Sequence, residues 1–142
     1  GETLDFARGT AEALEKAQGA GVDIDRISLS SDANGSMPVF DDSGNLVRLA
    51  VADIAGLHDE FRRLVDAGLP LADALSLVTA NPARRVGLAG RKGGLFVGAD
   101  ADLLLLGPGL EIDTVIARGR TLVREGRAEV KGTFESRLPA GI

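Results

Sequence analysis

"ISLSSDANGS", running from Ile27 to Ser36, is the stretch from which the fold of this chain can be worked out. Its apolar and small residues predict a β-strand that ends at Asp32, and the residues from Ala33 onward have the composition of a turn. The aspartate has two interpretations. The pattern by itself favours a turn residue whose side chain satisfies its own backbone. The alternative is a reactive carboxylate, since α/β folds place ligands at the carboxyl ends of their strands.

Segments with helical spacing of apolar residues lie on both sides of this strand. Before it, the spacing predicts a helix from Leu4 to Gln18. After it, Asp53 is placed to cap a helix from Ile54 to Ala67. Pro70 suits the first turn of the next helix, and Asn81-Pro82 is expected to separate two shorter helices. The first two thirds of the chain are therefore predicted to be α/β.

Two other parts of the sequence indicate β structure. "MPVFDDSGNLVRL" predicts two short extended pieces joined by a loop from Asp41 to Asn45. At Gly90 the sequence becomes rich in glycine and then strongly apolar, and the segment from Leu95 to Val130 carries short β-branched runs separated by glycines. We expect several short strands there. The chain thus reads as α/β up to about Leu88 and as mostly β after it.

Composition excludes several classes of function. The chain has 142 residues, of which 44% are hydrophobic, enough for a real core. Its formal charge is −5, with 21 acidic and 16 basic residues, which argues against binding to nucleic acid or to an anionic membrane. It contains no cysteine, so disulfides and thiolate metal sites are excluded, and a cytoplasmic location fits. No apolar segment approaches the roughly 18 residues of a membrane span.

Other catalytic motifs are poorly represented. "GLAGRKGG" lacks the Gly-Lys-Ser/Thr ending of a phosphate loop, and its glycines are better explained as turns. His58 is the single histidine, and a partly buried helical histidine is a better explanation of it than a metal ligand or a base. Ser30 and Ser31 lie within the expected strand and in no Gly-x-Ser-x-Gly elbow, which argues against a serine triad.

Longer motifs resemble those of the isoaspartyl (β-aspartyl) dipeptidases, a family within the amidohydrolase superfamily. The narrowest is Ser-Ser-Asp-x-Asn-Gly-Ser at Ser30–Ser36, followed by "FDDSGNL" and, near the end, "KGTFE". Gly-x-Asp-Ala-Asp-Leu at Gly98–Leu103 is similar to a stretch shared by many amidohydrolases. The resemblance covers nearly the whole chain, from the first helix to about Ser136.

The resemblance implies the C-terminal part of a distorted TIM (β/α)8 barrel followed by strands of a small β-sandwich. Residues 1–90 would hold the last barrel strand, Ile27–Asp32, and its flanking helices. Residues 91–136 would be the C-terminal strands of the sandwich, and 137–142 a tail. A whole barrel takes about 250 residues. We therefore expect the chain, which opens at Gly1 almost directly into a helix, to belong to a longer polypeptide.

The same resemblance implies a site and a cofactor. Family members hydrolyse the β-aspartyl bond with two zinc ions bridged by a carbamylated lysine and a hydroxide. Asp32 matches the last-strand aspartate, which ligates one metal, takes the proton of the hydroxide and passes it to the leaving amine. Ser36 matches the serine that binds the α-carboxylate of the dipeptide, with Asn34 and Gly35 shaping that loop. Ala33 departs from the family, where glycine is expected, which puts the loop geometry in doubt.

The other metal ligands of the family come from earlier barrel strands, and none of them is in this sequence. His58 follows the last-strand motif and cannot replace any of them. The chain by itself is therefore expected to be inactive. Two alternatives remain: a non-catalytic α/β fragment that self-associates and whose Asp32 loop is structural, or another amidohydrolase such as a deacetylase or a cyclic amidase. A small dipeptide substrate and a homo-oligomer are expected as partners.

Overall fold

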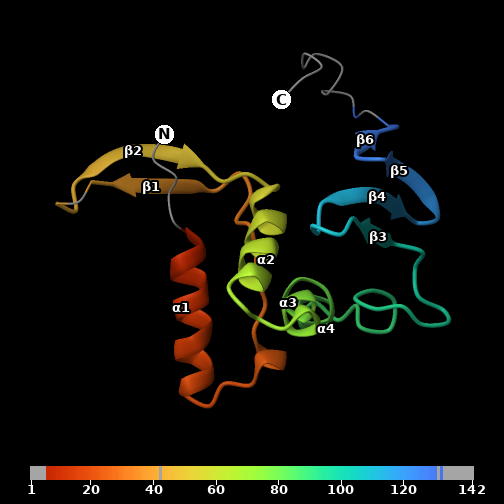
Figure 1. Cartoon of the computed structure of the whole chain (residues 1–142), viewed down its shortest axis with the longest axis horizontal. Coiled ribbons are helices and arrows are strands. Elements are labelled where there is room, and N and C mark those ends of the chain that lie inside the picture. Colours follow the sequence, from red (N-terminus) through yellow and green to blue (C-terminus); the bar gives the residue numbers. More distant parts are fainter. Residues whose placement is uncertain (1–5, 42, 131, 133–142) are drawn as a thin grey trace. The chain divides into compact units, whose positions relative to one another are not determined.

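The computed structural model describes residues 6–41, 43–130 and 132, and its contacts divide the chain into two compact units, Gly1–Ala89 and Gly90–Ile142. The expected start of the first helix at Leu4, the "KGTFE" motif apart from Gly132, and the tail at 137–142 lie outside the described residues. Unit 1 contains α1 (Phe6–Gly19), η1 (Ile24–Arg26), β1 (Ser36–Phe40), β2 (Leu46–Val51), α2 (Gly56–Asp66), α3 (Leu71–Val78) and α4 (Ala80–Arg85) (Figure 1). Unit 2 contains β3 (Leu103–Leu106), β4 (Ile112–Ala117), β5 (Arg120–Arg124) and β6 (Arg127–Ala128).

The helices of unit 1 build the core. Leu14 of α1, Leu64 of α2 and Leu77 of α3 form one buried cluster. Each buried leucine side chain contributes about 1.5–3 kcal/mol relative to its exposed state. Half-buried Ile27 and Leu29 pack against the same cluster, so the segment that leads to Asp32 lies on this core.

Helix ends follow the expected chemistry with small shifts. Asp53 Oδ1 accepts the backbone N–H of Ala55 at 3.0 Å, and α2 starts at Gly56, two residues later than predicted. Pro70 precedes α3 as expected. The break between the last two helices comes at Thr79 and not at Asn81-Pro82, because proline is tolerated in the first turn of α4, where its missing N–H costs nothing.

The expected hairpin is confirmed. β1 and β2 pair antiparallel, with Ser36 opposite Val51 at the open end. In the connecting loop Asp41 Oδ1 accepts the backbone N–H groups of Ser43 at 2.9 Å and Asn45 at 2.8 Å. The hydrogen bond from the Asn45 backbone, with those from its side chain and from Ser43, lowers the pKa of the Asp41 carboxyl. Asp41 is therefore a turn residue in the ordinary sense.

The expected strand from Ile27 to Asp32 has no pairing partner among the described residues, and its place as a barrel strand stays a prediction. Among the described residues these six belong to no sheet, and η1 ends immediately before them. The physical reason is that a strand needs a hydrogen-bonded neighbour, and neither β1 nor β2 lies beside this segment in a ladder. Its backbone is held instead by α3, through the N–H of Leu29, which donates to the Leu77 carbonyl at 3.0 Å.

Unit 2 is a four-stranded antiparallel sheet in the order β3-β4-β5-β6, which confirms the short strands predicted after Leu95. Its two tight turns, Arg118-Gly119 and Glu125-Gly126, have positive φ at both residues, from 50° to 76°, as two-residue hairpins with the native twist require. No described residue of this unit is buried, and three of the four leucines of β3 are classed as exposed.

Across residues 6–41, 43–130 and 132, no helix is both long and apolar enough to cross a lipid bilayer.

Candidate functional site

The turn from Asp32 to Gly35 is the feature on which the predicted site depends. The Gly35 N–H donates to the Asp32 carbonyl at 2.8 Å, which closes the turn. Asp32 and Asn34 have φ of 48° and 65°, in the left-handed region that asparagine and aspartate tolerate better than most residues. The hydroxyls of the two preceding serines accept the N–H groups of Asp32 and Ala33, each at 3.3 Å. Ser30 and Ser31 therefore support the turn through their side chains.

The turn is continuous with the hairpin. The Asn34 N–H donates to the Ala52 carbonyl at 3.0 Å, and the Ala52 N–H donates to the Gly35 carbonyl at 3.0 Å. These two bonds extend the β1–β2 ladder past Ser36 and Val51. The backbone that follows Asp32 in the chain is therefore held in place by the hairpin.

Glycine is required at position 35. A Cβ added there would lie 2.7 Å from Asp32 Oδ2, 2.8 Å from the Asp32 carbonyl oxygen and 2.9 Å from Asp32 Cγ. All three distances are shorter than real Cβ contacts, and one of the atoms is backbone. The Asp32 carboxylate therefore lies close over Gly35, and a side chain at position 35 would displace it.

The carboxylate of Asp32 makes no hydrogen bond or ion pair within the part of the chain that the structure describes, and the residue is exposed. An Asx turn would use it to accept a nearby N–H, as Asp41 does. Here the Asn34 and Gly35 N–H groups are bound to backbone carbonyls instead. The carboxylate thus keeps its full capacity to accept hydrogen bonds, protons or a cation.

The other three predicted site residues follow directly in the chain. Asn34 is exposed, Gly35 is half-buried, and Ser36 is exposed as the first residue of β1. The structure therefore brings all four predicted residues into one turn, while their catalytic and binding roles stay predictions.

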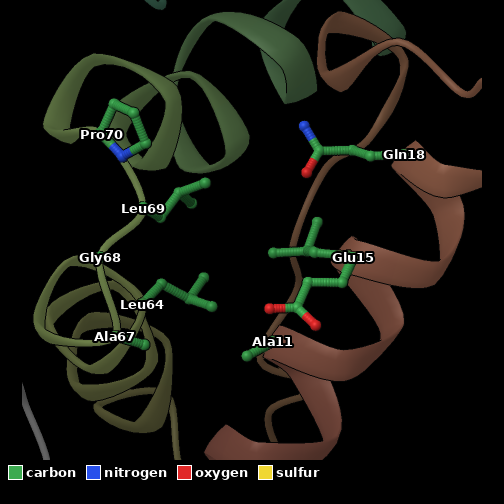
Figure 2. Close-up of a pocket in the computed structure, with 9 residues that line it drawn as sticks. Ala11, Glu15, Gln18, Leu64, Ala67, Gly68, Leu69 and Pro70 are labelled. Atoms are coloured by element: carbon green, nitrogen blue, oxygen red, sulfur yellow. The ribbon is translucent and has the colours of Figure 1, made fainter.

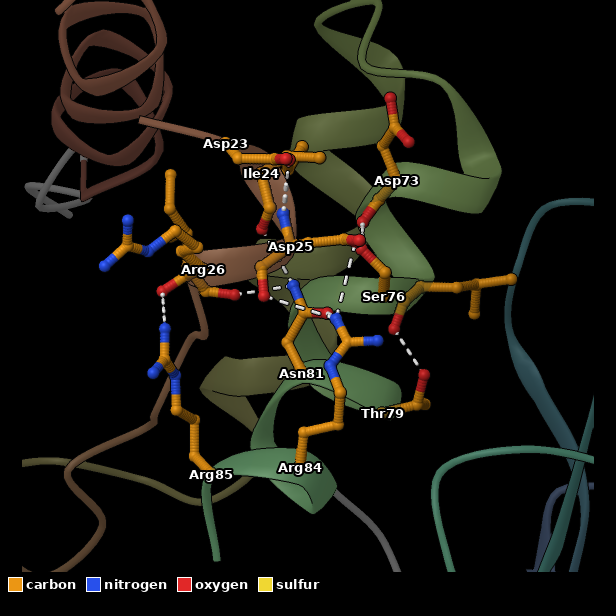
Figure 3. A network of polar contacts seen from close by, with 12 residues as sticks. Asp23, Ile24, Asp25, Arg26, Asp73, Ser76, Thr79, Asn81, Arg84 and Arg85 are labelled. Atoms are coloured by element: carbon orange, nitrogen blue, oxygen red, sulfur yellow. Dashed lines mark hydrogen bonds and ion pairs between the residues drawn. The ribbon is translucent and has the colours of Figure 1, made fainter. Parts of the chain in front are cut away.

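Asn81 is a residue that sequence reasoning used only as a helix breaker. Its side chain is buried, with 1% exposed, and Nδ2 donates to the carbonyls of Ile24 at 2.8 Å and Ile27 at 2.7 Å (Figure 3). Arg84 contacts Asn81 Oδ1 and donates to the Asp25 carbonyl at 3.2 Å, and Arg85 donates to the Arg26 carbonyl at 2.8 Å. The one available signal was an Asn-Pro pair beside two arginines, which does not by itself indicate burial.

The second amidohydrolase-like motif, at Gly98–Leu103, is fully used in holding unit 2 together. The Lys92 ammonium contacts Asp102 and pairs with Asp100 at 3.0 Å, while Asp102 Oδ1 accepts the Arg118 N–H at 2.7 Å. The hydrogen bond from Lys92 is the main cause that lowers the pKa of both carboxyls, and the hydrogen bond to Asp102 raises the pKa of Lys92. This motif is therefore structural.

The metal donors of the described residues do not make a complete site. No three histidine, aspartate or glutamate side chains lie together in residues 6–41, 43–130 and 132. His58 lies in α2 with its ring 5.9 Å from that of Phe61, as the helical-histidine interpretation expects. A catalytic zinc takes about three protein ligands. Asp32 can supply one of them, so the residues described here fit a metal only in part.

A hollow lies between α1 and the turn that joins α2 to α3 (Figure 2). Its lining is mostly apolar, with Glu15 and Gln18 as the polar side chains. None of the four predicted site residues lines it. The hollow therefore adds nothing to the chemistry of the Asp32 turn.

Comparison with known proteins gives a family match over most of the chain. The sequence profile of the amidohydrolase family matches residues 6–122. The adenine deaminase of Methanothrix thermoacetophila is 37% identical over 90 residues, which are 61% of this chain and 15% of that protein.

Solved structures give the same fold. The β-aspartyl dipeptidase of Fervidobacterium islandicum AW-1, in complex with β-Asp-Leu, is 36% identical with a TM-score of 0.72, over 87% of this chain and 33% of that one. The N-acetyl-D-glucosamine-6-phosphate deacetylase of Mycobacterium smegmatis is 29% identical with a TM-score of 0.56, over 78% and 34%. The chain thus spans about a third of these enzymes or less. The likeness confirms the expected fold class, a part of an amidohydrolase-type α/β barrel with short strands after it.

Proposed function

This chain belongs to the amidohydrolase family, and on that premise we propose that it forms part of a metal-dependent enzyme that cleaves the β-aspartyl bond of isoaspartyl dipeptides. The observation that carries the proposal is the Asp32 carboxylate, which is exposed and has no partner among the described residues. The turn that follows Asp32 in the chain is held by hydrogen bonds to Ala52. The likeness to a β-aspartyl dipeptidase bound to β-Asp-Leu supports the choice of substrate. A small-molecule substrate is what the hydrolase relatives imply.

Asp32 is proposed as metal ligand and general acid/base. Hydrolysis of an amide adds hydroxide to the carbonyl carbon and a proton to the leaving nitrogen, so one group must take a proton from water and deliver it to the amine. A bound metal of the zinc type would lower the pKa of that water and polarise the carbonyl. Asp32 has the free oxygens that such a transfer needs, and its remaining metal partners are expected from a part of the enzyme outside this chain.

Ser36 is proposed to donate its hydroxyl to the substrate α-carboxylate. It follows Asp32 by four residues and is exposed at the start of β1. The two ladder bonds at Ala52 fix the backbone on which both side chains stand. Asp32 and Ser36 therefore keep a defined separation, which is the requirement for holding one small substrate at two points.

A conformational explanation of Asp32 competes with the catalytic one, because a φ of 48° by itself favours aspartate, asparagine or glycine. Asp32→Asn separates the two, since asparagine tolerates the same φ and lacks only the negative charge. In the protein as its own cell makes it, we expect kcat for β-Asp-Leu to fall by about 10²–10⁴-fold. The thermal midpoint of the metal-free protein should stay unchanged, because the carboxylate has no contact among the described residues to lose. Full activity in Asp32→Asn would contradict the proposal.

Deacetylation and deamination are second candidates, favoured by the similarity to the M. smegmatis deacetylase and the M. thermoacetophila deaminase. A side-by-side assay with β-Asp-Leu, N-acetylglucosamine 6-phosphate and adenine distinguishes them. Turnover of the sugar or of adenine without turnover of the dipeptide would replace the proposed substrate and leave the family assignment intact. A homo-oligomer and a cytoplasmic location stay predictions.

A further inference from the structure

The Asp32 turn contains an Asn-Gly pair, Asn34-Gly35, which has a covalent chemistry of its own. The side-chain amide carbon of an asparagine is electrophilic, and the backbone nitrogen of the next residue can attack it and close a five-membered ring. Glycine in the second position favours ring closure, because it has no side chain to crowd the nitrogen and restricts the backbone least. Asn34 is exposed, and its side chain makes no hydrogen bond within residues 6–41, 43–130 and 132. Its amide is therefore open to this reaction.

The other two asparagines of the chain lack these conditions. Asn81 is buried, both hydrogens of its Nδ2 are donated to backbone carbonyls, and the next residue is Pro82, which has no N–H to lose. Asn45 is exposed, but its Nδ2 donates to Asp41 Oδ2 at 3.1 Å and the residue that follows it is a leucine. These two asparagines therefore serve as internal controls for Asn34.

The geometry of the turn explains why this pair stands here. Asn34 has a φ of 65°, in the left-handed region that glycine, asparagine and aspartate accommodate best. A side chain at position 35 would come within 2.7 Å of Asp32 Oδ2. The turn that presents the Asp32 carboxylate therefore favours, at both positions, a residue that also promotes ring closure.

We propose that Asn34 is a site of spontaneous deamidation, which converts the Asp32 turn into an aspartyl or an isoaspartyl form. The Gly35 nitrogen bonds to Asn34 Cγ, the Cγ–Nδ2 bond breaks, and Nδ2 leaves as ammonia with the proton of the Gly35 N–H. Water then opens the succinimide ring. Addition of water at Cγ gives an ordinary aspartate, whereas addition at the Asn34 carbonyl carbon leaves the chain running through Cγ as an isoaspartyl residue. In either case one water is consumed and one ammonia is released.

Backbone hydrogen bonds of the turn set the rate of this reaction in the folded protein. The Gly35 N–H donates to the Asp32 carbonyl at 2.8 Å, and the Gly35 carbonyl accepts the Ala52 N–H at 3.0 Å. The Gly35 nitrogen must leave its bond to Asp32 before it can lose its proton and reach Cγ, so the turn has to open locally. Local opening of an exposed turn costs less than global unfolding. We therefore expect the folded protein to convert Asn34 about 10–100-fold more slowly than the unfolded chain.

The isoaspartyl product changes the spacing of the candidate site. Its main chain passes through Cβ and Cγ, which adds one backbone atom between Asp32 and Ser36. The proposed acid/base and the proposed substrate-binding hydroxyl then no longer keep their separation, and turnover should fall. This consequence rests on the proposed function, whereas the deamidation itself does not.

The test is to age the protein as its own cell makes it, at neutral and at mildly alkaline pH, beside the same protein unfolded in urea. The tryptic peptide covering residues 27–48 holds both Asn34 and Asn45, so fragmentation in the mass spectrometer assigns the amide-to-acid mass gain to one of them. Electron-transfer fragmentation distinguishes isoaspartate from aspartate, and an unaged sample corrects for conversion during digestion. Asn34→Gly is the matched control, since glycine accepts the same φ and has no side-chain amide.

We expect the mass gain in the folded protein to appear first at Asn34, and faster at the higher pH, because the attacking nitrogen must lose its proton. Asn45 and Asn81 should be unchanged at that time. Activity on β-Asp-Leu should fall in step with the isoaspartyl fraction, while Asn34→Gly keeps whatever activity it had before ageing.

The contrary outcomes are distinguishable. An intact Asn34 in the folded protein, over a period in which the unfolded chain converts it, would overturn the inference, and so would equal conversion of Asn45. Isoaspartate at Asn34 without loss of turnover would overturn the functional consequence alone. If Asp32→Asn keeps its activity, the proposed function fails, and the mass gain at Asn34 still decides the deamidation.

Discussion

The turn at Asp32 and the turn at Asp102 are both short, acidic and rich in alanine and glycine, yet their carboxylates are used in opposite ways. Asp102 accepts the Arg118 N–H and contacts Lys92, and its neighbour Asp100 pairs with Lys92 and Arg91. Asp32 has none of these contacts among the described residues. A carboxylate whose acceptor capacity is used by its own chain holds structure, and one whose capacity is free is available to a ligand.

The surroundings of the two turns sharpen the contrast. Asp32 follows a segment that lies against the core of unit 1, and its turn continues into a hairpin ladder. Asp102 lies in a unit with no buried residue among those described, so its ion pairs and turn contacts carry a larger share of local order.

The largest effect is expected from Gly35→Ala. Its Cβ would overlap Asp32, which must shift at a cost of about 1–3 kcal/mol of stability, and activity should fall because the carboxylate moves. Gly9→Ala is the control, since Gly9 lies in α1 with open space around it and alanine there should stabilise by up to about 1 kcal/mol. Thermal unfolding of both variants measures this. Equal midpoints for the two alanine variants would show that the Asp32–Gly35 contact is not tight.

A smaller effect, on stability alone, is expected from Asp102→Asn. The change removes the charge that holds Lys92 and weakens the acceptor of the Arg118 N–H, so the thermal midpoint should fall. Catalysis should be unchanged, because the carboxylate was never free to react. Asp32→Asn should show the reverse: a stable protein without turnover. Loss of kcat in Asp102→Asn at a temperature where the variant is folded would remove the distinction between the two turns.

The smallest effect is expected from pH. The pKa of Asp100 and of Asp102 is lowered by the hydrogen bond from Lys92, so both are lower folded than unfolded. Their contribution is then fully present above the unfolded pKa of about 3.9 and is lost as pH falls through the folded pKa. Unit 2 should lose stability in acid, and Asp102→Asn should flatten that loss. Melting curves taken between about pH 2 and 6 measure it, and parallel curves for the two proteins would argue against the ion pairs.

Most elements of the fold could be predicted because they depend on local spacing. The apolar positions of α1 and α2, the Asp41–Asn45 loop and the short strands after Leu95 were all found from period and turn chemistry. The observed helix ends differ from the predicted ones by up to about two residues, because a proline or an aspartate near a helix end fits more than one boundary position. The Ile27–Asp32 strand could not be settled this way, since pairing depends on a neighbouring strand and not on the segment itself.

The residues of the candidate site also differ in whether the sequence alone could identify them. Asp32, Asn34, Gly35 and Ser36 could be named from the sequence because they are contiguous and carry turn residues in a narrow motif. Asn81 could not, because its role needs a contact across 54 and 57 positions of the chain. The sequence around Asn81 does not distinguish a helix breaker from a buried amide that binds two distant backbone carbonyls.

The sequence by itself determined the order of helices and strands, the family and the residues of the Asp32 turn, because period, turn chemistry and motif are local properties of a chain. Only the tertiary structure decided which acidic residues are free and which are used. Asp32, Asp41 and Asp102 look alike as letters, and each stands in a turn or loop. The partners of Asp41 are the N–H groups of Ser43 and Asn45 in its own loop, whereas Asp102 accepts the N–H of Arg118, which lies 16 residues away and is brought to it only by folding.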